Sequence, residues 1–180
     1  MLFGTKETFG IEIEINKIYC NQFIGDGFFV IHINNNCYGR REEYATTFPS
    51  IARQLRHCLK NRVNSDMALE DYSKGNIVEG YYLQNYSEAN LSDCDKKLLN
   101  KTKTLWEWSP DEAFDDGSHV IHFDDNDTTR IIGFKSCIVD GDCKVMENSC
   151  SEIQLPREDF KGIIKDAYLF LKSFSANSKT

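Results

Sequence analysis

The sequence FGIEIEIN at residues 9–16 places phenylalanine or isoleucine at every second position, with glycine, glutamate or asparagine between them. Alternation with a period of two residues is typical of a β-strand with one buried and one exposed face. Residues 28–33 (FFVIHI) form a second apolar, largely β-branched and aromatic run, and Gly25-Asp26-Gly27 before it predicts a turn. We therefore expect the chain to open as two antiparallel strands, with a further turn at residues 34–36.

A helix is predicted to follow at Phe48. Thr46 or Thr47 is available as its cap, and Pro49 is tolerated in the first helical turn, where a backbone N–H is not needed. Apolar side chains then recur at the helical spacing as far as Leu59, while the arginines and lysines between them point elsewhere. This helix is expected to lie on the sheet and to show a basic outer surface.

The last part of the chain predicts a short strand and a long helix. The strand covers residues 152–155, and Pro156 with the two acidic residues that follow it marks the start of the helix. A stripe of apolar side chains then continues to Phe174, which predicts a helix packed on the sheet. Residues 175–180 are expected to be a frayed tail.

Between these segments the signals are weaker. Residues 64–90 are polar and rich in tyrosine, and a strand is predicted near residues 81–83. Tyr81 and Tyr82 fit two interpretations, because an exposed tyrosine is a good interface residue and a buried one is a good strand residue. Residues 92–105 show a weak helical pattern.

A clear helix start follows at Ser109-Pro110-Asp111-Glu112, where serine caps, proline takes the first helical position and glutamate closes a capping box. This helix is expected to end after about two turns at Gly117. Residues 119–123 and 130–134 then predict a hairpin around the loop at residues 124–129.

These elements predict one α+β domain over residues 1–180, in which helices pack on a mostly antiparallel β-sheet. The length and the 41% hydrophobic composition are sufficient for a single compact core. Trp106, Trp108 and Phe114 are expected to anchor the short helix to that core, although a functional tryptophan cluster is the alternative.

Negative charge is concentrated between Lys103 and Arg130, a stretch with no lysine or arginine inside it. Such a single-sign surface attracts a basic partner and repels nucleic acids and anionic membranes. We therefore expect neither DNA, RNA nor an anionic membrane as a partner. The alternative is a set of solvated loops without a binding role. The carboxylates of the stretch are Glu107, Asp111, Glu112, Asp115, Asp116, Asp124, Asp125 and Asp127.

No catalytic, metal or cofactor motif is recognised. The seven cysteines are an odd number without close pairing, and the first residues lack the apolar region of a secretory signal, which together indicate a reduced, cytosolic protein. Cys137, Cys143 and Cys150 are spaced too widely for a typical zinc site. The loop starting at Asp124 lacks the glycine and glutamate of a calcium loop, and His119 and His122 are expected on opposite faces of a strand.

Several segments resemble the immunity protein 42 family of bacterial polymorphic-toxin and contact-dependent growth inhibition systems. They are MLFGTKETFGIE at residues 1–12, TTF at 46–48, WSPDEAFDDGS at 108–118, FDD at 123–125 and RIIGF at 130–134. The resemblance spans most of the chain and implies a cytosolic antidote that binds and neutralises one toxin. The family pattern has no catalytic residues to transfer, which implies that the protein is not an enzyme.

Together, charge and resemblance lead to a specific hypothesis. The partner is expected to be a basic toxin domain, most readily a nuclease with an EndoU-like ribonuclease as the first choice, because nuclease clefts are basic. The alternatives are a small hydrolase that uses aspartate and histidine of residues 115–127, and an acidic regulatory adaptor. The expected toxin-binding residues are Asp115, Asp116, Asp124, Asp125 and Asp127, with Trp106, Trp108, Tyr81 and Tyr82 as anchors.

Overall fold

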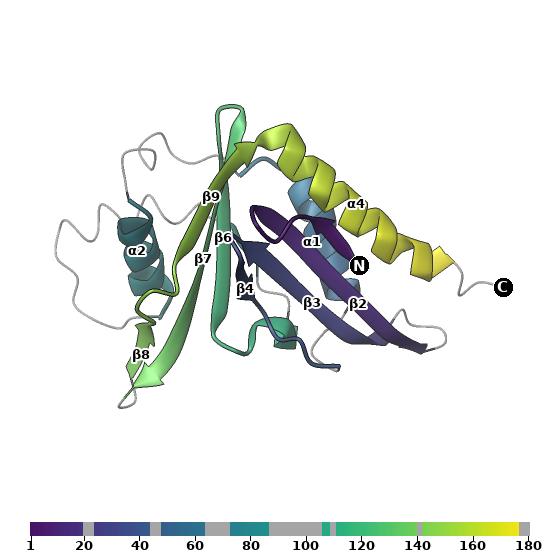
Figure 1. The fold of residues 1–180 in the computed structure, drawn as a ribbon, viewed down its shortest axis with the longest axis horizontal. Coiled ribbons are helices and arrows are strands. Elements are labelled where there is room, and N and C mark those ends of the chain that lie inside the picture. Colours follow the sequence, from purple (N-terminus) through teal and green to yellow (C-terminus); the bar gives the residue numbers. More distant parts are fainter. Residues whose placement is uncertain are drawn as a thin grey trace.

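The fold is α+β: two antiparallel sheets are covered by helices (Figure 1). It is seen in a computed structural model that describes residues 1–19, 24–43, 48–63, 73–86, 106–108, 111–139 and 142–176. The predicted fold class is confirmed. The weakly helical residues 92–105 and the expected caps at Thr46, Thr47 and Ser109 lie outside the described residues.

The first sheet has the order β1-β2-β3-β4, and all neighbouring strands are antiparallel. Its strands are β1 (Leu2–Gly4), β2 (Phe9–Tyr19), β3 (Ile24–Ile33) and β4 (Asn36–Tyr38). Asn34 and Asn35 have φ angles of 49° and 65°, as the two central residues of a type I′ hairpin turn require. The expected strand pair and the asparagine turn are therefore confirmed.

The predicted turn at Gly25-Asp26-Gly27 is wrong, because these residues belong to β3 and pair with β2. At Gly27 the neighbouring strand β2 and the ring of Phe48 come too close to leave room for a side chain. A Cβ at this position would lie 1.9 Å from the carbonyl oxygen of Glu14 and 2.8 Å from Cζ of Phe48. Glycine inside a strand often occurs where another backbone or side chain packs closely. In the sequence, this glycine was interpreted as evidence for a turn. The link between β2 and β3 falls at residues 20–23, outside the described residues.

The second sheet has the order β5-β6-β7-β8, with β9 also paired to β7. Its strands are β5 (Trp106–Trp108), β6 (Ser118–Asp125), β7 (Thr128–Val139), β8 (Asp142–Val145) and β9 (Ser151–Pro156). The predicted β6–β7 hairpin is confirmed, although its strands are longer than expected and its turn is only Asn126-Asp127. β9 is also confirmed.

Three α-helices are described: α1 (Phe48–Lys60), α2 (Lys74–Tyr86) and α4 (Arg157–Ala176), together with the 3₁₀ turn η1 (Asp111–Phe114). α1 and α4 are confirmed, and α4 includes residues 175 and 176 of the expected frayed tail. The strand predicted near residues 81–83 is wrong, because they lie in α2. The helix predicted to end at Gly117 is wrong in length, because η1 is one short turn.

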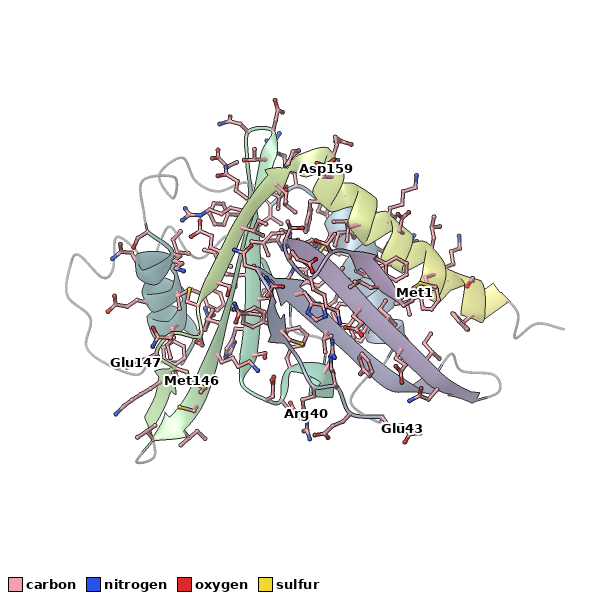
Figure 2. The ribbon with its side chains drawn as sticks, in the orientation of Figure 1. Met1, Arg40, Glu43, Met146, Glu147 and Asp159 are labelled. Atoms are coloured by element: carbon pink, nitrogen blue, oxygen red, sulfur yellow. The ribbon has the colours of Figure 1, made fainter. Side chains whose placement is uncertain are left out.

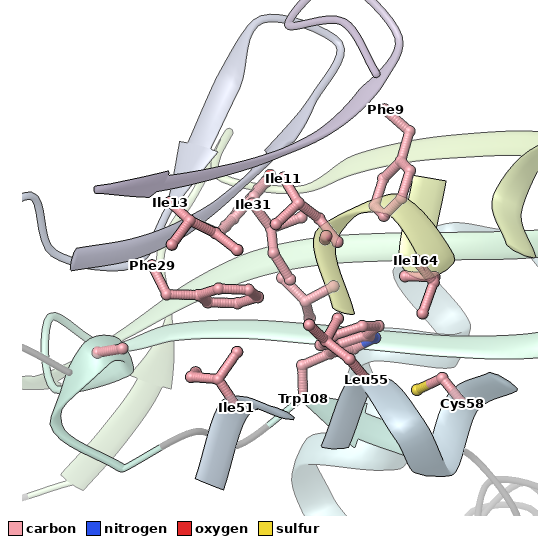
Figure 3. Close-up of a cluster of buried hydrophobic side chains, with 14 of the residues drawn as sticks. Phe9, Ile11, Ile13, Phe29, Ile31, Ile51, Leu55, Cys58, Trp108 and Ile164 are labelled. Carbon is pink, nitrogen blue, oxygen red and sulfur yellow. The ribbon is translucent and has the colours of Figure 1, made fainter. Parts of the chain in front are cut away.

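The main core lies where the two sheets, α1 and α4 meet (Figure 3). Phe29 of β3, Leu55 of α1 and Trp108 of β5 converge there and are fully or almost fully buried. The apolar face of the FGIEIEIN strand points into this core, as its alternation predicts. The exposed arginines and lysine of α1 form the basic outer surface that was expected.

A second apolar cluster covers the opposite face of the second sheet, under α2. Ile77, Val78, Tyr81 and Tyr82 of the helix pack there on Ile121, Phe123, Ile132 and Phe134 of β6 and β7. Because β6 and β7 are covered on both faces, the hairpin is rigid along most of its length, and only its ends reach the surface.

Candidate functional site

The acidic stretch of the sequence is divided between the two ends of β6. Asp115 and Asp116 follow η1 at one end, and Asp125 and Asp127 lie at the hairpin turn at the other end (Figure 1). The eight residues of β6 separate these groups, and at about 3.4 Å per residue the separation is about 24 Å. The single negative patch inferred from the sequence is therefore two smaller groups of carboxylates.

The group near η1 is largely neutralised by neighbouring cations. Asp116 pairs with Nζ of Lys135 at 2.8 Å and also accepts a hydrogen bond from the backbone N–H of Ser118. Glu42, and to a smaller extent Asp115 and Asp116, raise the pKa of Arg40, which shows that the guanidinium lies in their field. Of Asp115 and Asp116, Asp115 is exposed and Asp116 is half-buried, so this pair is a weak attractor for a basic partner.

Asp124 is a structural residue and not part of an exposed tip. It is 6% exposed and accepts hydrogen bonds from Oγ1 of Thr129 at 2.7 Å and from the backbone N–H of Val63 at 3.1 Å. Nε of Arg157 lies 3.3 Å from Oδ2, the oxygen that also accepts from Val63, and forms an ion pair with it. Asp124 thus ties the end of α1 and the start of α4 to the hairpin and is not available to a partner.

The other carboxylates at the hairpin turn are joined by two from α4. The backbone N–H of Arg157 donates to the carbonyl of Asp127 at 2.8 Å, so the first turn of α4 is held beside the hairpin turn. Glu158 and Asp159 follow and are exposed (Figure 2). We call the four residues Asp125, Asp127, Glu158 and Asp159 the acidic end.

The arginines nearest the acidic end are engaged with other groups. Arg157 contacts Asp124, Nε of Arg130 binds Glu152, and Arg62 donates to the carbonyl of Asn126. Nζ of Lys161, whose side chain is half-buried, lies 3.7 Å from Oε1 of the exposed Glu158. Arg62 keeps its positive charge, because its partner is a neutral carbonyl, and Lys161 adds a second one. The four carboxylates outnumber these two cations, so the acidic end keeps a net negative charge.

Sequence reasoning missed Glu158 and Asp159 as members of this group. It assigned them only to the dipole of the last helix, which is correct but incomplete. Their place beside the hairpin turn results from the pairing of β9 with β7, which aligns Pro156 with Thr128. That pairing joins segments about 30 residues apart and has no signal in local patterns.

The aromatic residues expected as anchors are buried where the structure describes them. Trp108 is 1% exposed, stacks on Phe29 and donates from Nε1 to Nδ1 of His122 at 3.0 Å. Tyr81 and Tyr82 face the second sheet from α2. The side chain of Trp106 lies outside the described residues. Burial therefore favours the first interpretation of Trp108, as a core residue, and the buried interpretation of Tyr81 and Tyr82.

Glu107, His119 and Ser136 form a hydrogen-bonded line across three strands. Oε1 of Glu107 lies 2.8 Å from Nδ1 of His119, whose Nε2 lies 2.9 Å from Oγ of Ser136. A carboxylate, an imidazole and a hydroxyl in this order also occur in hydrolases, but those need donors for an oxyanion. The N–H of Ser136 is instead bonded to the carbonyl of Gly117, and Glu107 also binds the hydroxyl of Tyr81. The line therefore ties α2 to the sheet.

Cavities and metal sites do not suggest another centre. Among the described residues no group of three or more histidine, cysteine, aspartate or glutamate side chains could hold a metal ion. Of the surface hollows, one of about 390 Å³ is polar, next to the acidic end, and lined by Asp125, Arg130, Glu152 and Gln154. Another, of about 420 Å³, is apolar and lies between α2 and β8. In the described part of the chain, no helix is long and apolar enough to cross a membrane.

Comparison with known proteins identifies the family. The model of the family described as Immunity protein 42 matches residues 1–170. This chain belongs to the immunity protein 42 family. The resemblance carried by the WSPDEAFDDGS segment and its companions is confirmed. No curated protein matches the sequence of this immunity protein.

A solved structure supports the fold. The immunity protein is similar to "CdiI from Burkholderia dolosa AUO158", with a TM-score of 0.61 at 18% sequence identity. The similarity covers 93% of this chain and 97% of the other. At this identity the likeness concerns the arrangement of helices and strands and not individual contact residues.

Family membership decides between the classes of function left open by the sequence. Members of the immunity protein 42 family neutralise a cognate toxin and are typically not enzymes. The protein is therefore a toxin inhibitor, and the hydrolase built on residues 115–127 is not its function. The separation of Asp115 and Asp116 from the hairpin turn agrees with this conclusion.

Proposed function

We propose that this immunity protein 42 member works in the cytosol and neutralises a basic toxin domain with nuclease activity, which it contacts through its acidic end. The observation that carries the proposal is the clustering of Asp125, Asp127, Glu158 and Asp159, while the nearby Arg157 and Arg130 face the carboxylates of Asp124 and Glu152. A nuclease holds phosphates in a basic cleft, and an acidic inhibitor is complementary to that cleft.

The geometry of the acidic end suits a rapid association. Its carboxylates stand on a tight hairpin turn and on the first turn of a 20-residue helix, and both are fixed to the core. Charges on rigid elements act on an approaching partner over about 8 Å at physiological ionic strength. Association steered in this way is faster at low salt, as expected for an inhibitor that must intercept a toxin.

The contact set differs from the one expected from sequence. Asp125 and Asp127 are retained, and Glu158 and Asp159 are added. Asp115 and Asp116 become a secondary contact because Lys135 and Arg40 reduce their field. A ribonuclease of the EndoU-like type is the specific partner that we propose, because RNA is an abundant cytosolic target that a basic cleft binds through its phosphates.

The proposal is tested by co-expression with the polypeptide encoded directly upstream of this chain's gene. We expect that polypeptide to arrest growth alone, to be harmless with the immunity protein present, and to be captured by it. Total RNA and DNA from arrested cells show which nucleic acid is cut. If the upstream polypeptide is toxic and captured but leaves both nucleic acids intact, the toxin is not a nuclease. The role of this chain as its inhibitor would still hold. A harmless, unbound polypeptide would favour the acidic adaptor.

A further inference from the structure

An apolar row on β7 continues beyond the helix that covers it. Ile132 and Phe134 are fully buried under α2. Side chains alternate along a strand, so Ser136 and Ile138 follow them on the same face. Ile138 is 77% exposed, because β7 and β8 extend past the other strands of the sheet (Figure 1). A large aliphatic side chain thus stands uncovered on a projecting hairpin.

A groove lies next to this projection, between α2 and β8. It has a volume of about 420 Å³ and a mostly apolar lining from Val78, Tyr82, Val145 and Cys150. Met146, which follows β8, is 42% exposed (Figure 2). An apolar groove beside an exposed aliphatic side chain is the kind of surface that can serve as an interaction site.

The same surface carries charges of both signs. Glu79 and Lys144 line the groove and are exposed, as is Glu147 beside Met146. This surface therefore presents a projecting side chain, Ile138, next to the groove. It also presents the carboxylate of Glu79 and the ammonium group of Lys144 at the groove. A two-fold contact requires this combination, because each copy must present both members of every contacting pair.

We propose that a second copy of this chain docks here in a two-fold contact, with Ile138 of each copy entering the groove of the other and Glu79 facing Lys144 across the interface. The contact is small. Interfaces below about 1,200 Å² are typically weak, so a dissociation constant of about 10–100 µM is expected. This homodimer does not depend on the identity of the toxin, and its acidic ends stay outside the contact.

Salt dependence separates this contact from toxin binding. Each copy has a net charge of −7, so two copies repel each other at long range, and salt screens that repulsion. Salt also screens the two Glu79–Lys144 attractions of the proposed contact, so the homodimer should depend less on the sodium chloride concentration than toxin binding does. Binding of a basic toxin to the acidic end should become weaker as that concentration rises.

The test is sedimentation velocity of the isolated full chain over a concentration series, with wild type, Ile138→Lys and Leu169→Lys. Leu169 is a matched control, since it is another exposed aliphatic residue, on α4. We expect wild type and L169K to dimerise with rising concentration, and I138K to weaken the dimer at least about tenfold while keeping the wild-type circular dichroism spectrum.

Three results would overturn the homodimer: wild type that stays monomeric at about 200 µM, about twice the upper end of the expected range; an I138K protein that dimerises like wild type; or dimerisation that weakens with salt as steeply as toxin binding does. If I138K instead weakens capture of the upstream polypeptide by a monomeric immunity protein, the patch belongs to the toxin contact and the homodimer is also overturned.

A mixing experiment tests the two-fold arrangement. Glu79→Lys and Lys144→Glu each place like charges across the interface, so each variant alone should dimerise less than wild type. An equimolar mixture restores opposite charges at both contacts of a mixed dimer, and the association should return. A contact within one chain cannot produce that recovery. A mixture that remains as monomeric as its components would contradict the proposed pairing.

Discussion

The ring of Tyr38 in β4 occupies the space in which a side chain of residue 133 in β7 would lie. A Cβ on Gly133 would be 2.4 Å from Cε2 and 2.5 Å from Cζ of that ring. The hydroxyl of Tyr38 donates to the carbonyl of Ser149 at 2.8 Å, and burial raises its pKa to about 12, so it stays a donor at every pH of interest. Tyr38 thereby fixes the first sheet against the second.

We predict that Gly133→Ala destabilises the protein. A methyl group there must displace a ring that is held at both ends, and overpacking of this kind costs about 1–3 kcal/mol. Urea unfolding followed by tryptophan fluorescence measures the change. The matched control is Gly162→Ala in α4, because apart from its chain neighbours and the backbone of its own helix no atom lies within 4 Å of the added methyl group. That variant should be more stable by about 0.5–1 kcal/mol, and equal effects of the two alanines would contradict the assignment.

We also predict that Asp124→Asn lowers the free energy of unfolding by about 2–4 kcal/mol, although Asp124 stands in the acidic loop sequence. The substitution removes the charge facing Arg157 and places an amide group next to donors at Val63 and Thr129. Asp127→Asn is the control. Asp127 is exposed, and its substitution should change stability by less than about 0.5 kcal/mol. Urea denaturation of both variants makes the comparison.

The sequence predicted elements whose pattern repeats within a few residues. The alternation around Ile11 and Ile13 and the stripe of α4 were sufficient for strand and helix, because each buries one face on a large core. α2 was missed even though Ile77 and Tyr81, four residues apart, share a helix face. Gly75 and Gly80 nearby indicated a break, and burial against the second sheet overrides that local preference.

The site was harder to predict than the fold because residues that are neighbours in the sequence need not be neighbours on the surface. Asp116 and Asp125 are close in sequence but lie at opposite ends of β6. Asp127 and Glu158 are far apart in sequence but are joined by the backbone hydrogen bond from Arg157. Asp124 differs from its neighbour Asp125 only because the strand turns it toward Arg157. None of these relationships has a local signal.

A third prediction concerns pH. His122 is completely buried, and burial lowers its pKa to about 4, with a smaller opposing effect of Asp124. Since the indole of Trp108 is only a donor, Nδ1 of His122 must accept and so must carry no proton. The pKa of an unfolded histidine is about 6.5, so neutral His122 contributes stability that is complete above pH 6.5 and is lost as pH falls toward 4. The loss amounts to about 3 kcal/mol.

The measurement compares urea unfolding of wild type and His122→Gln at pH 7.5 and pH 4.5. Glutamine keeps an acceptor for Trp108 but does not titrate, so the variant should lose about 2 kcal/mol less than wild type between the two pH values. His32, whose pKa burial also lowers, titrates in both proteins and cancels in the difference. Parallel losses of stability would show that His122 remains neutral in both states or is solvated in the folded protein.

The last prediction addresses the acidic end directly. Asp125→Lys combined with Asp127→Lys changes the local charge by four units where the field of Glu158 and Asp159 is also felt. The association rate with the captured toxin should fall by about 10- to 100-fold at low salt, and its dependence on salt should become weaker, since steering acts mainly on the rate of encounter. Stopped-flow fluorescence or surface plasmon resonance at several salt concentrations measures both effects.

Asp115→Lys with Asp116→Lys is the matched control with the same change in net charge. Its association rate should fall less, because Lys135 and Arg40 already reduce the negative field there. If the two double variants slowed association equally, net charge and not the acidic end would steer the toxin.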